Sequence, residues 1–218
     1  MDEVFWDERY LSSSTLWSRN PNPQLVTEAA DLVPGTALDV GCGEGADAIW
    51  LAEHGWTVTA VDLSSVALER GASQALERGA DIARRITWLH ADLTEWVPPS
   101  AFYDLVSAQF VHLPRDQREV IHRRLAEAVT PGGTLLVVGH HPSDLHSTVP
   151  RPRAPELFFT ASDVDGLLAS GEWTTLLDEA RPRTALDSDG RTTTIHDAVL
   201  KATRTAGGAT PGGRPAGS

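Results

Sequence analysis

The chain has 218 residues, of which 41% are hydrophobic and 22% are charged, and these are the proportions of a globular domain with a full core. Its formal net charge of −12 disfavours binding to nucleic acids or to anionic membranes. The single cysteine, Cys42, excludes an internal disulfide and a four-cysteine zinc site. No apolar run is long enough to span a membrane, and the acidic N-terminus is unlike a signal peptide. We therefore expect a cytoplasmic protein without a membrane or nucleic-acid partner.

Strand and helix patterns alternate along the first two thirds of the chain. Strands are expected at Thr36–Val40, 57–61, Ile86–His90, 103–108 and 134–138. Helices are expected at 22–34, 46–54, 64–79 and 114–129. Asn22-Pro23 supplies a helix cap followed by proline at the first helical position, and Ser64 and Ser65 can cap the third helix. This order predicts a parallel sheet with helices on both faces.

The C-terminal third predicts one more helix and a hairpin. Thr160-Ala161-Ser162-Asp163 fits a capping box, with Phe159 and Val164 as its hydrophobic staple, so a helix is expected from there to about residue 170. Strands at 173–180 and 192–203 flank a turn and have no helix between them, so they are expected to pair antiparallel. The predicted fold is α/β, with a seven-stranded, mostly parallel, Rossmann-like sheet and a C-terminal antiparallel hairpin.

A glycine-rich turn joins the first strand to the following helix, in the sequence Leu38-Asp39-Val40-Gly41-Cys42-Gly43-Glu44-Gly45. Glycines let the backbone pass close to a ligand, and a helix N-terminus offers unpaired N–H groups. Asp62, at the end of the next strand, is placed to accept hydrogen bonds from ribose hydroxyls. The segment therefore predicts an adenosine-bearing cofactor. Because residues 41–46 also fit the relaxed G-x-G-x-x-A pattern, an NAD(P)-dependent oxidoreductase is one alternative.

Two details of this turn carry a resemblance to a known family. Asp39 lies inside the strand, and the glycines fall at 41, 43 and 45, so that LDVGCGEG resembles the first motif of the class I S-adenosylmethionine-dependent methyltransferases. The resemblance covers roughly residues 30–204, and it includes the seven-stranded sheet with a final hairpin. It implies S-adenosylmethionine as methyl donor and S-adenosylhomocysteine as product. We expect one methyltransferase domain at 1–204 and a disordered tail at 205–218, which is rich in glycine and proline.

The resemblance also implies which residues hold the cofactor. They are Asp39, Gly41, Cys42, Gly43, Asp62, Leu63, Asp92, Leu93, Gln109 and Trp17. Asp92 would accept a hydrogen bond from the adenine amino group, the backbone N–H of Leu93 would meet a ring nitrogen, and Gln109 would lie by the methionine part. The residues alone leave other roles open: Asp62 as a helix cap, Asp92 as a solvated loop residue, and Cys42 as packing.

Three histidines are the candidates for catalysis or acceptor contact. His112 follows the fourth strand, and His140 and His141 follow the fifth, where ligands of such sheets bind. A neutral imidazole can act as a general base near pH 7. Adjacent histidines point in different directions and make a poor metal pair, so no metal site is expected. Arg151 and Arg153, in the next loop, are either contacts for an anionic substrate or solvated charges.

Aromatic residues crowd the N-terminal segment before the first core helix, namely Phe5, Trp6, Tyr10 and Trp17. In similar small-molecule methyltransferases of the thiopurine and tellurite type, a leading segment covers the site, so residues 1–21 are expected to form a lid. Burial against the helix layer is the alternative. The predicted function is methyl transfer to a small-molecule oxygen, nitrogen, sulfur or metalloid nucleophile, by a monomer or homodimer. A non-catalytic S-adenosylmethionine-binding regulatory protein is the second alternative.

Overall fold

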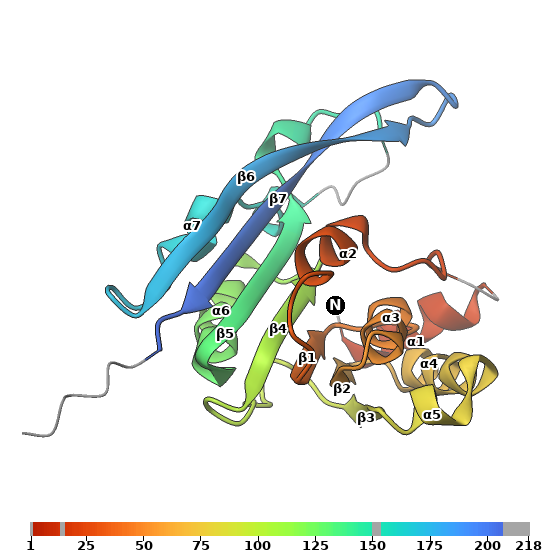
Figure 1. The fold of residues 1–218 in the computed structure, drawn as a ribbon. Helices are drawn as coiled ribbons and strands as arrows, with labels where there is room; N and C mark the ends of the chain where they lie inside the picture. The colour runs from red at the N-terminus through yellow and green to blue at the C-terminus, as the bar shows by residue number, and fades with distance from the viewer. Residues whose placement is uncertain (1, 14–15, 150–153, 207–218) are drawn as a thin grey trace, which may run out of the picture.

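The computed structural model describes residues 2–13, 16–149 and 154–206. Within these residues, seven strands form one sheet in the order β3-β2-β1-β4-β5-β7-β6 (Figure 1). The strands are β1 Thr36–Val40, β2 Thr57–Asp62, β3 Ile86–His90, β4 Tyr103–Gln109, β5 Val129–His140, β6 Trp173–Leu186 and β7 Thr192–Arg204. β7 runs antiparallel to both of its neighbours, and the other pairs are parallel. The predicted fold class is confirmed.

Helices cover both faces of the sheet. They are α1 Glu3–Leu11, α2 Pro23–Ala29, α3 Ala46–Glu53, α4 Ser65–Arg78, α5 Ala80–Ala83, α6 Arg115–Ala128 and α7 Ala161–Asp165, with short 3-10 helices η1 Pro142–Asp144 and η2 Pro155–Leu157. One apolar layer joins the sheet to α6 and α7, and the other joins it to α2, α3 and the end of α4. In β5, Leu135 and Val137 belong to the first layer, whereas Leu136 and Val138 belong to the second. This alternation explains why β5 reads as a continuous apolar run.

The predicted helix at the capping box is much shorter than expected. Thr160 and Asp163 form the box, and Phe159 and Val164 are buried as predicted. However, α7 ends at Asp165, with Gly166 as its C-cap, instead of continuing to about residue 170. Glycine is a poor helix former, and the chain must turn there to enter β6.

Other elements also differ from the sequence prediction: α2 ends at Ala29, before the expected residue 34, and α5 was not predicted. Helix α1 lies in the segment expected to form a lid, for which no helix was predicted; its N-cap is Asp2, whose side chain accepts a hydrogen bond from the backbone N–H of Phe5. β5 begins five residues earlier than predicted, at Val129. β6 continues through Pro182 to Leu186 because it is an edge strand, where a missing N–H is tolerated. Most of the predicted disordered tail, residues 207–218, lies outside the described residues.

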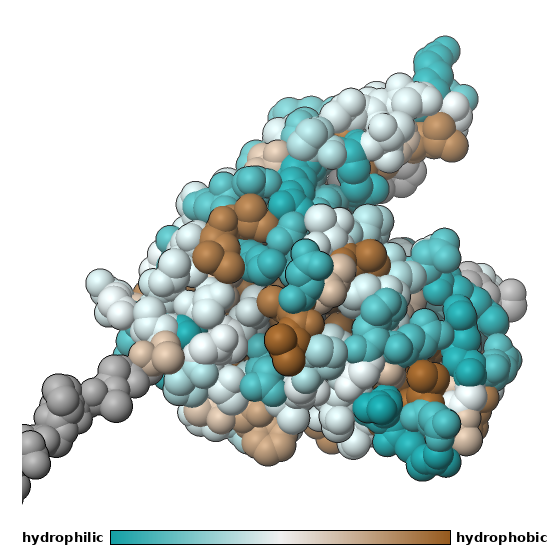
Figure 2. Space-filling model, in the orientation of Figure 1, coloured by the Kyte–Doolittle hydropathy of each residue, from teal (hydrophilic) through white to brown (hydrophobic). Residues whose placement is uncertain are grey.

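The β6–β7 hairpin extends beyond the rest of the sheet. β7 pairs with β6 as far as Thr192, but its pairing with β5 stops at Asp197, opposite His140. The free end of the hairpin projects past α2 (Figure 1), and Figure 2 shows a notch between it and the body of the molecule. Glu28 of α2 holds the hairpin through ion pairs with Arg181 at 2.6 Å and Lys201 at 3.2 Å. Among the described helices, none combines the length and apolarity needed to cross a membrane.

Candidate functional site

The glycine turn between β1 and α3 has a backbone conformation that requires glycine. Gly41, Gly43 and Gly45 have φ angles of 66°, 53° and 79°, in the left-handed region that side chains disfavour. At Gly45 a Cβ atom would also lie 2.3 Å from the ring of Trp88, which packs beneath the turn. The turn therefore brings bare backbone to the carboxyl end of the sheet.

Asp62 is fixed beside this turn by two backbone hydrogen bonds. Its Oδ2 accepts from the N–H of Gly43 at 2.8 Å, and its Oδ1 accepts from the N–H of Ser64 at 2.9 Å. Ser64, rather than Asp62, caps α4, because its hydroxyl accepts from the N–H of Ala67 at 3.1 Å. Burial raises the pKa of Asp62. Since a carboxylate has about four lone-pair positions, each oxygen of Asp62 retains capacity for a further donor.

The end of β3 places a second acidic residue next to Asp62. The N–H of Ala91 donates to the carbonyl oxygen of Asp62 at 3.1 Å, so the residues after β3 continue alongside those after β2. Asp92 Oδ1 accepts from the N–H of Thr94 at 2.8 Å and from its hydroxyl at 2.7 Å. Leu63 and Leu93, which follow the two strand ends, are both half-buried.

Two buried acceptor atoms near the turn have no hydrogen-bond donor among the described residues. They are Oδ2 of Asp39 in β1 and Oε1 of Gln109 at the end of β4. Asp39 pairs with Ser107 across the two strands, and Gln109 donates to the Ser107 hydroxyl at 2.9 Å, so the three side chains share one face. Asp39 is 1% exposed. Buried acceptors without donors are costly, and this region therefore favours a ligand that carries N–H groups.

Several negative charges surround these acceptors. Burial and the nearby carboxylates of Asp47 and Asp62 raise the pKa of Asp39 well above its ordinary range. Burial raises the pKa of Asp47 to about 6, although the N–H of Asn22 donates to it at 2.6 Å. Burial also raises the pKa of the Cys42 thiol, which keeps it protonated, in keeping with a packing role. The electrostatics favour a cationic ligand.

The N-terminal segment closes over the glycine turn. Asp7 of α1 accepts from the hydroxyl of Ser64 at 2.5 Å, and Glu3 pairs with His90 at 3.0 Å. Glu44, within the turn, accepts from the N–H groups of Leu16 and Trp17 at 3.1 and 3.3 Å. These contacts hold α1 against the residues after β2 and the end of β3, and they hold residues 16 and 17 against the glycine turn.

Two aromatic side chains of this segment lie directly above Gly43. Trp17 donates from Nε1 to the Tyr10 hydroxyl at 3.1 Å, and a Cβ at Gly43 would lie 2.9 Å from that hydroxyl oxygen. Tyr10 is 3% exposed, whereas Trp17 is 44% exposed. A ligand that approaches the backbone of Gly43 therefore has to displace this pair.

The structure separates the three candidate histidines into two groups. The Nε2 atoms of His112, which follows β4, and His140, which is the last residue of β5 and does not follow the strand as predicted, lie 3.3 Å apart. His141 instead caps η1, where its Nδ1 lies 2.9 Å from the Ser143 hydroxyl, and its ring lies 6.4 Å from the ring of His196. Arg151 and Arg153 lie outside the described residues. In the described ranges, no three His, Cys, Asp or Glu side chains are grouped to hold a metal ion.

Sequence reasoning missed the residues that hold the lid. Glu44 and Asp47 were interpreted as charges favourable to the start of α3, but they bind backbone N–H groups of residues 16, 17 and 22. Arg70 of α4 also pairs with Glu44 at 3.0 Å. An available signal was the presence of two carboxylates in one helical turn beside a glycine loop.

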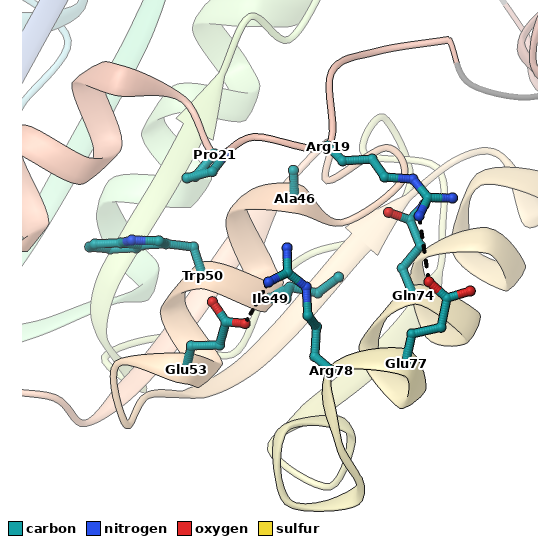
Figure 3. Close-up of a pocket in the computed structure, with 9 residues that line it drawn as sticks. All are labelled: Arg19, Pro21, Ala46, Ile49, Trp50, Glu53, Gln74, Glu77 and Arg78. Atoms are coloured by element: carbon teal, nitrogen blue, oxygen red, sulfur yellow. Dashed lines mark hydrogen bonds and ion pairs between the residues drawn. The ribbon is translucent and has the colours of Figure 1, made fainter.

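A shallow pocket of about 60 Å³ lies away from the strand ends (Figure 3). It is lined by residues 19 and 21 and by the outer sides of α3 and α4. Arg19 crosses it to Glu77 at 3.4 Å, and Arg78 pairs with Glu53 at 3.4 Å. These charges are already paired, and the pocket is separate from the glycine turn and the histidines.

Comparison with known proteins agrees with this geometry. Residues 37–133 match the family model described as a methyltransferase domain. An uncharacterized methyltransferase of Mycobacterium tuberculosis is 41% identical over 126 residues, which are 56% of this chain and 59% of that protein. Residues 37–133 of this chain are therefore similar to a methyltransferase domain. The similarity to methyltransferases supports the S-adenosylmethionine interpretation of the glycine turn over the NAD(P) interpretation.

Two further relatives of this chain come from sequence and from structure. The 2-heptyl-1-hydroxyquinolin-4(1H)-one methyltransferase of Mycobacteroides abscessus is 29% identical over 132 residues, covering 59% of this chain and 57% of that enzyme. TehB from Haemophilus influenzae superposes with a TM-score of 0.67 at 19% identity, over 93% of this chain and 66% of that one. At that identity the likeness shows the fold. The chain spans 59% of the length of the first curated relatives that it matches.

Proposed function

We propose that this protein transfers the methyl group of S-adenosylmethionine to a small-molecule nucleophile. The observation that carries the proposal is the set of buried, donorless acceptors, Asp39 Oδ2 and Gln109 Oε1, among acidic groups beside the glycine turn. S-adenosylmethionine has an ammonium group with N–H donors and a positively charged sulfonium. Such a ligand would satisfy both the hydrogen-bonding and the charge requirements of this region.

The remaining cofactor residues fit the adenosine part. We assign the ribose hydroxyls to Asp62, whose carboxylate is held in place by Gly43 and Ser64. Asp92 and the backbone N–H of Leu93 would bind the polar edge of the adenine. The half-buried side chains of Leu63 and Leu93 would supply apolar contact with the base.

The backbone of the turn and one lid residue complete the proposed cofactor site. Gly41, Cys42 and Gly43 offer bare backbone to the methionine part, although the N–H of Gly43 already donates to Asp62. We assign Trp17 to the wall above it, because Trp17 lies over Gly43 in the closed segment. Entry of the cofactor then requires residues 1–21 to act as a lid that opens.

The chain itself has a limited chemical task in this reaction. The sulfonium supplies an activated methyl group when it is bound, so the protein has to align the acceptor and exclude water. The lid contacts of Asp7 and Glu44, together with the contact of Asp47 with Asn22 at the start of α2, keep the closed site together. Oxygen, nitrogen, sulfur and metalloid acceptors are all compatible with this task.

A small-molecule acceptor is supported by two observations. The net charge of −12 disfavours a nucleic-acid partner. The relative from Mycobacteroides abscessus is named for a small hydroxyquinolinone. We place the protein in the cytoplasm as a monomer or homodimer. We assign the approach of the acceptor to the notch beside the hairpin (Figure 2).

Calorimetry with the full chain tests cofactor binding. We expect S-adenosylmethionine and S-adenosylhomocysteine to bind and NAD to show no heat. Asp62→Asn should weaken binding at least 10-fold, because hydrogen bonds to charged groups are worth about 1.5–3 kcal/mol. The exposed Asp31→Asn variant changes the same charge and should bind as the parent protein does. Tight binding of NAD alone would favour the oxidoreductase alternative.

A methylation assay separates an enzyme from a binding protein. The panel contains phenols, amines, thiols and metalloid anions, with S-adenosylhomocysteine formation as the readout. Turnover of one acceptor class is the expected result. Tight S-adenosylmethionine binding without turnover of any class would favour the non-catalytic regulatory alternative.

A further inference from the structure

At the ends of β4 and β5, two imidazoles share one hydrogen bond. The 3.3 Å separation of the His112 and His140 Nε2 atoms requires one nitrogen to donate and the other to accept. When both rings are neutral, one proton lies between the two Nε2 atoms. The pair keeps its geometry when a proton is added at one ring, because that ring then donates to its neutral partner. This arrangement suits proton uptake from a bound acceptor.

Flat apolar surfaces surround the histidine pair. The ring of His140 lies 4.9 Å from that of Phe110 and 5.6 Å from that of Phe158, and the ring of His112 lies 6.4 Å from that of Trp6 in α1. Phe110 has a φ angle of 53°, which is unfavourable for a phenylalanine. Such strain collects at functional sites, and here it directs an aromatic ring toward His140. Contact with aromatic rings makes the binding free energy of a planar ligand more favourable.

Positive charge borders this aromatic group on two sides. The guanidinium carbon of Arg183 in β6 lies 6.0 Å from the Phe110 ring centroid, and this side chain is ion-paired through Nε with both oxygens of Asp197. Arg9 of α1 lies 5.8 Å from the ring of Trp6. Asp197 offsets the charge of Arg183, so the attraction for a ligand that develops negative charge comes mainly from Arg9.

We propose that His112 and His140 form the proton-accepting part of the acceptor site, and that the acceptor is a planar aromatic compound with a hydroxyl group. This inference rests on the proposed methyl transfer. The imidazole nitrogen takes the hydroxyl proton while the oxygen forms its bond to the methyl carbon. The carbon–sulfur bond breaks with its electron pair going to sulfur, and the imidazolium returns its proton to water. Atoms and charge balance without another reactant.

Acidity explains why the acceptor is an aromatic hydroxyl. A phenol with a pKa of about 10 is within reach of an imidazole with a pKa of about 6.5, whereas an aliphatic hydroxyl is far less acidic. Thiols ionise nearer neutral pH, metalloid anions already carry charge, and amines attack as neutral species. Among these acceptors, only the aromatic hydroxyl has a methylation rate that depends strongly on a base at the centre of an aromatic site.

The test compares matched acceptors with the full chain at saturating S-adenosylmethionine. The probes are 1-naphthol, 1-naphthylamine, 1-naphthalenethiol and tellurite. We expect 1-naphthol to have the highest kcat/KM. His112→Gln and His140→Gln should each lower kcat for 1-naphthol by about 100-fold or more, with loss of the limb of the pH profile that reports the base. His54→Gln, at the exposed end of α3, is the control and should leave turnover unchanged.

A second acceptor distinguishes a base from a contact residue. A nitrophenol that is already ionised at the assay pH needs no base, so the two histidine variants should methylate it at nearly the parental rate. Equal losses for 1-naphthol and the nitrophenol would overturn the proposal, as would a preference for the amine, thiol or tellurite. If the chain fails to bind S-adenosylmethionine or to methylate any acceptor, the proposed function itself fails.

Discussion

Replacing Asp47 by asparagine should make the fold more stable at neutral pH. In the unfolded chain this carboxyl ionises near its ordinary pKa of 3.8, but burial raises its pKa in the folded protein to about 6. The folded state therefore loses stability relative to the unfolded state as the pH rises from about 4 to about 6. One pKa unit corresponds to about 1.4 kcal/mol, so the ionised Asp47 costs the folded protein about 3 kcal/mol above pH 6.

Asparagine keeps the oxygen that accepts from the N–H of Asn22 at 2.6 Å, while the charge is removed. We expect Asp47→Asn to raise the free energy of unfolding by about 1–3 kcal/mol at pH 8 and to have little effect at pH 4. Urea unfolding of the ligand-free protein at both pH values measures this difference. Asp31→Asn, at an exposed position, should change stability by less than about 0.5 kcal/mol. An Asp47→Asn protein that is no more stable than the parent at pH 8 would refute the reasoning.

Three more predictions concern stability and the lid. Burial, together with a neighbouring arginine, lowers the pKa of His122 to about 3. The fold should therefore lose about 2 kcal/mol between pH 7 and pH 5, a loss that His122→Gln removes; an unchanged slope in urea titrations would contradict this. At Gly139 a Cβ would lie 2.3 Å from the Phe159 ring, so Gly139→Ala should cost about 1–3 kcal/mol, and adding Phe159→Leu should recover part of that cost. If the two substitutions change the free energy of unfolding additively, the predicted clash between residue 139 and Phe159 does not exist. Asp7→Ala should loosen the lid and speed tryptic cleavage after Arg19 while the remaining domain resists; equal cleavage rates would show that Asp7 does not hold the lid.

Local patterns predicted the elements that depend on neighbouring residues. The glycine turn, the capping box at Thr160 and the alternation of strands and helices all follow from short-range sequence signals, and the structure confirms them. The prediction of a helix to about residue 170 was wrong. The cap and the staple favour a longer helix, but the turn into β6 ends α7 at Asp165. The extension of β6 through Pro182 depends on its edge position, which no local pattern specifies.

The candidate site depended on contacts between distant segments. Asp62 and Asp92 could be placed from strand ends alone, since parallel strands bring their carboxyl ends to one edge. The pairing of His112 with His140 depends on how β4 and β5 are aligned, and their separation of 28 residues hides it. The hold of Glu44 on residues 16 and 17 is equally non-local. Sequence reasoning therefore named the residues but could not divide the histidines between two places.

The latch formed by Asp7, Glu44 and Asp47 has a consequence for the timing of turnover. Tyr10 and Trp17 lie over Gly43 when this latch is closed, so cofactor exchange has to wait for the lid to open. The histidine pair also lies against this segment, through Trp6, so the same lid borders the proposed acceptor site. Under the proposed function, the methyl donor and the spent cofactor would pass only while the lid is open. The frequency of lid opening then sets the upper limit on the turnover rate.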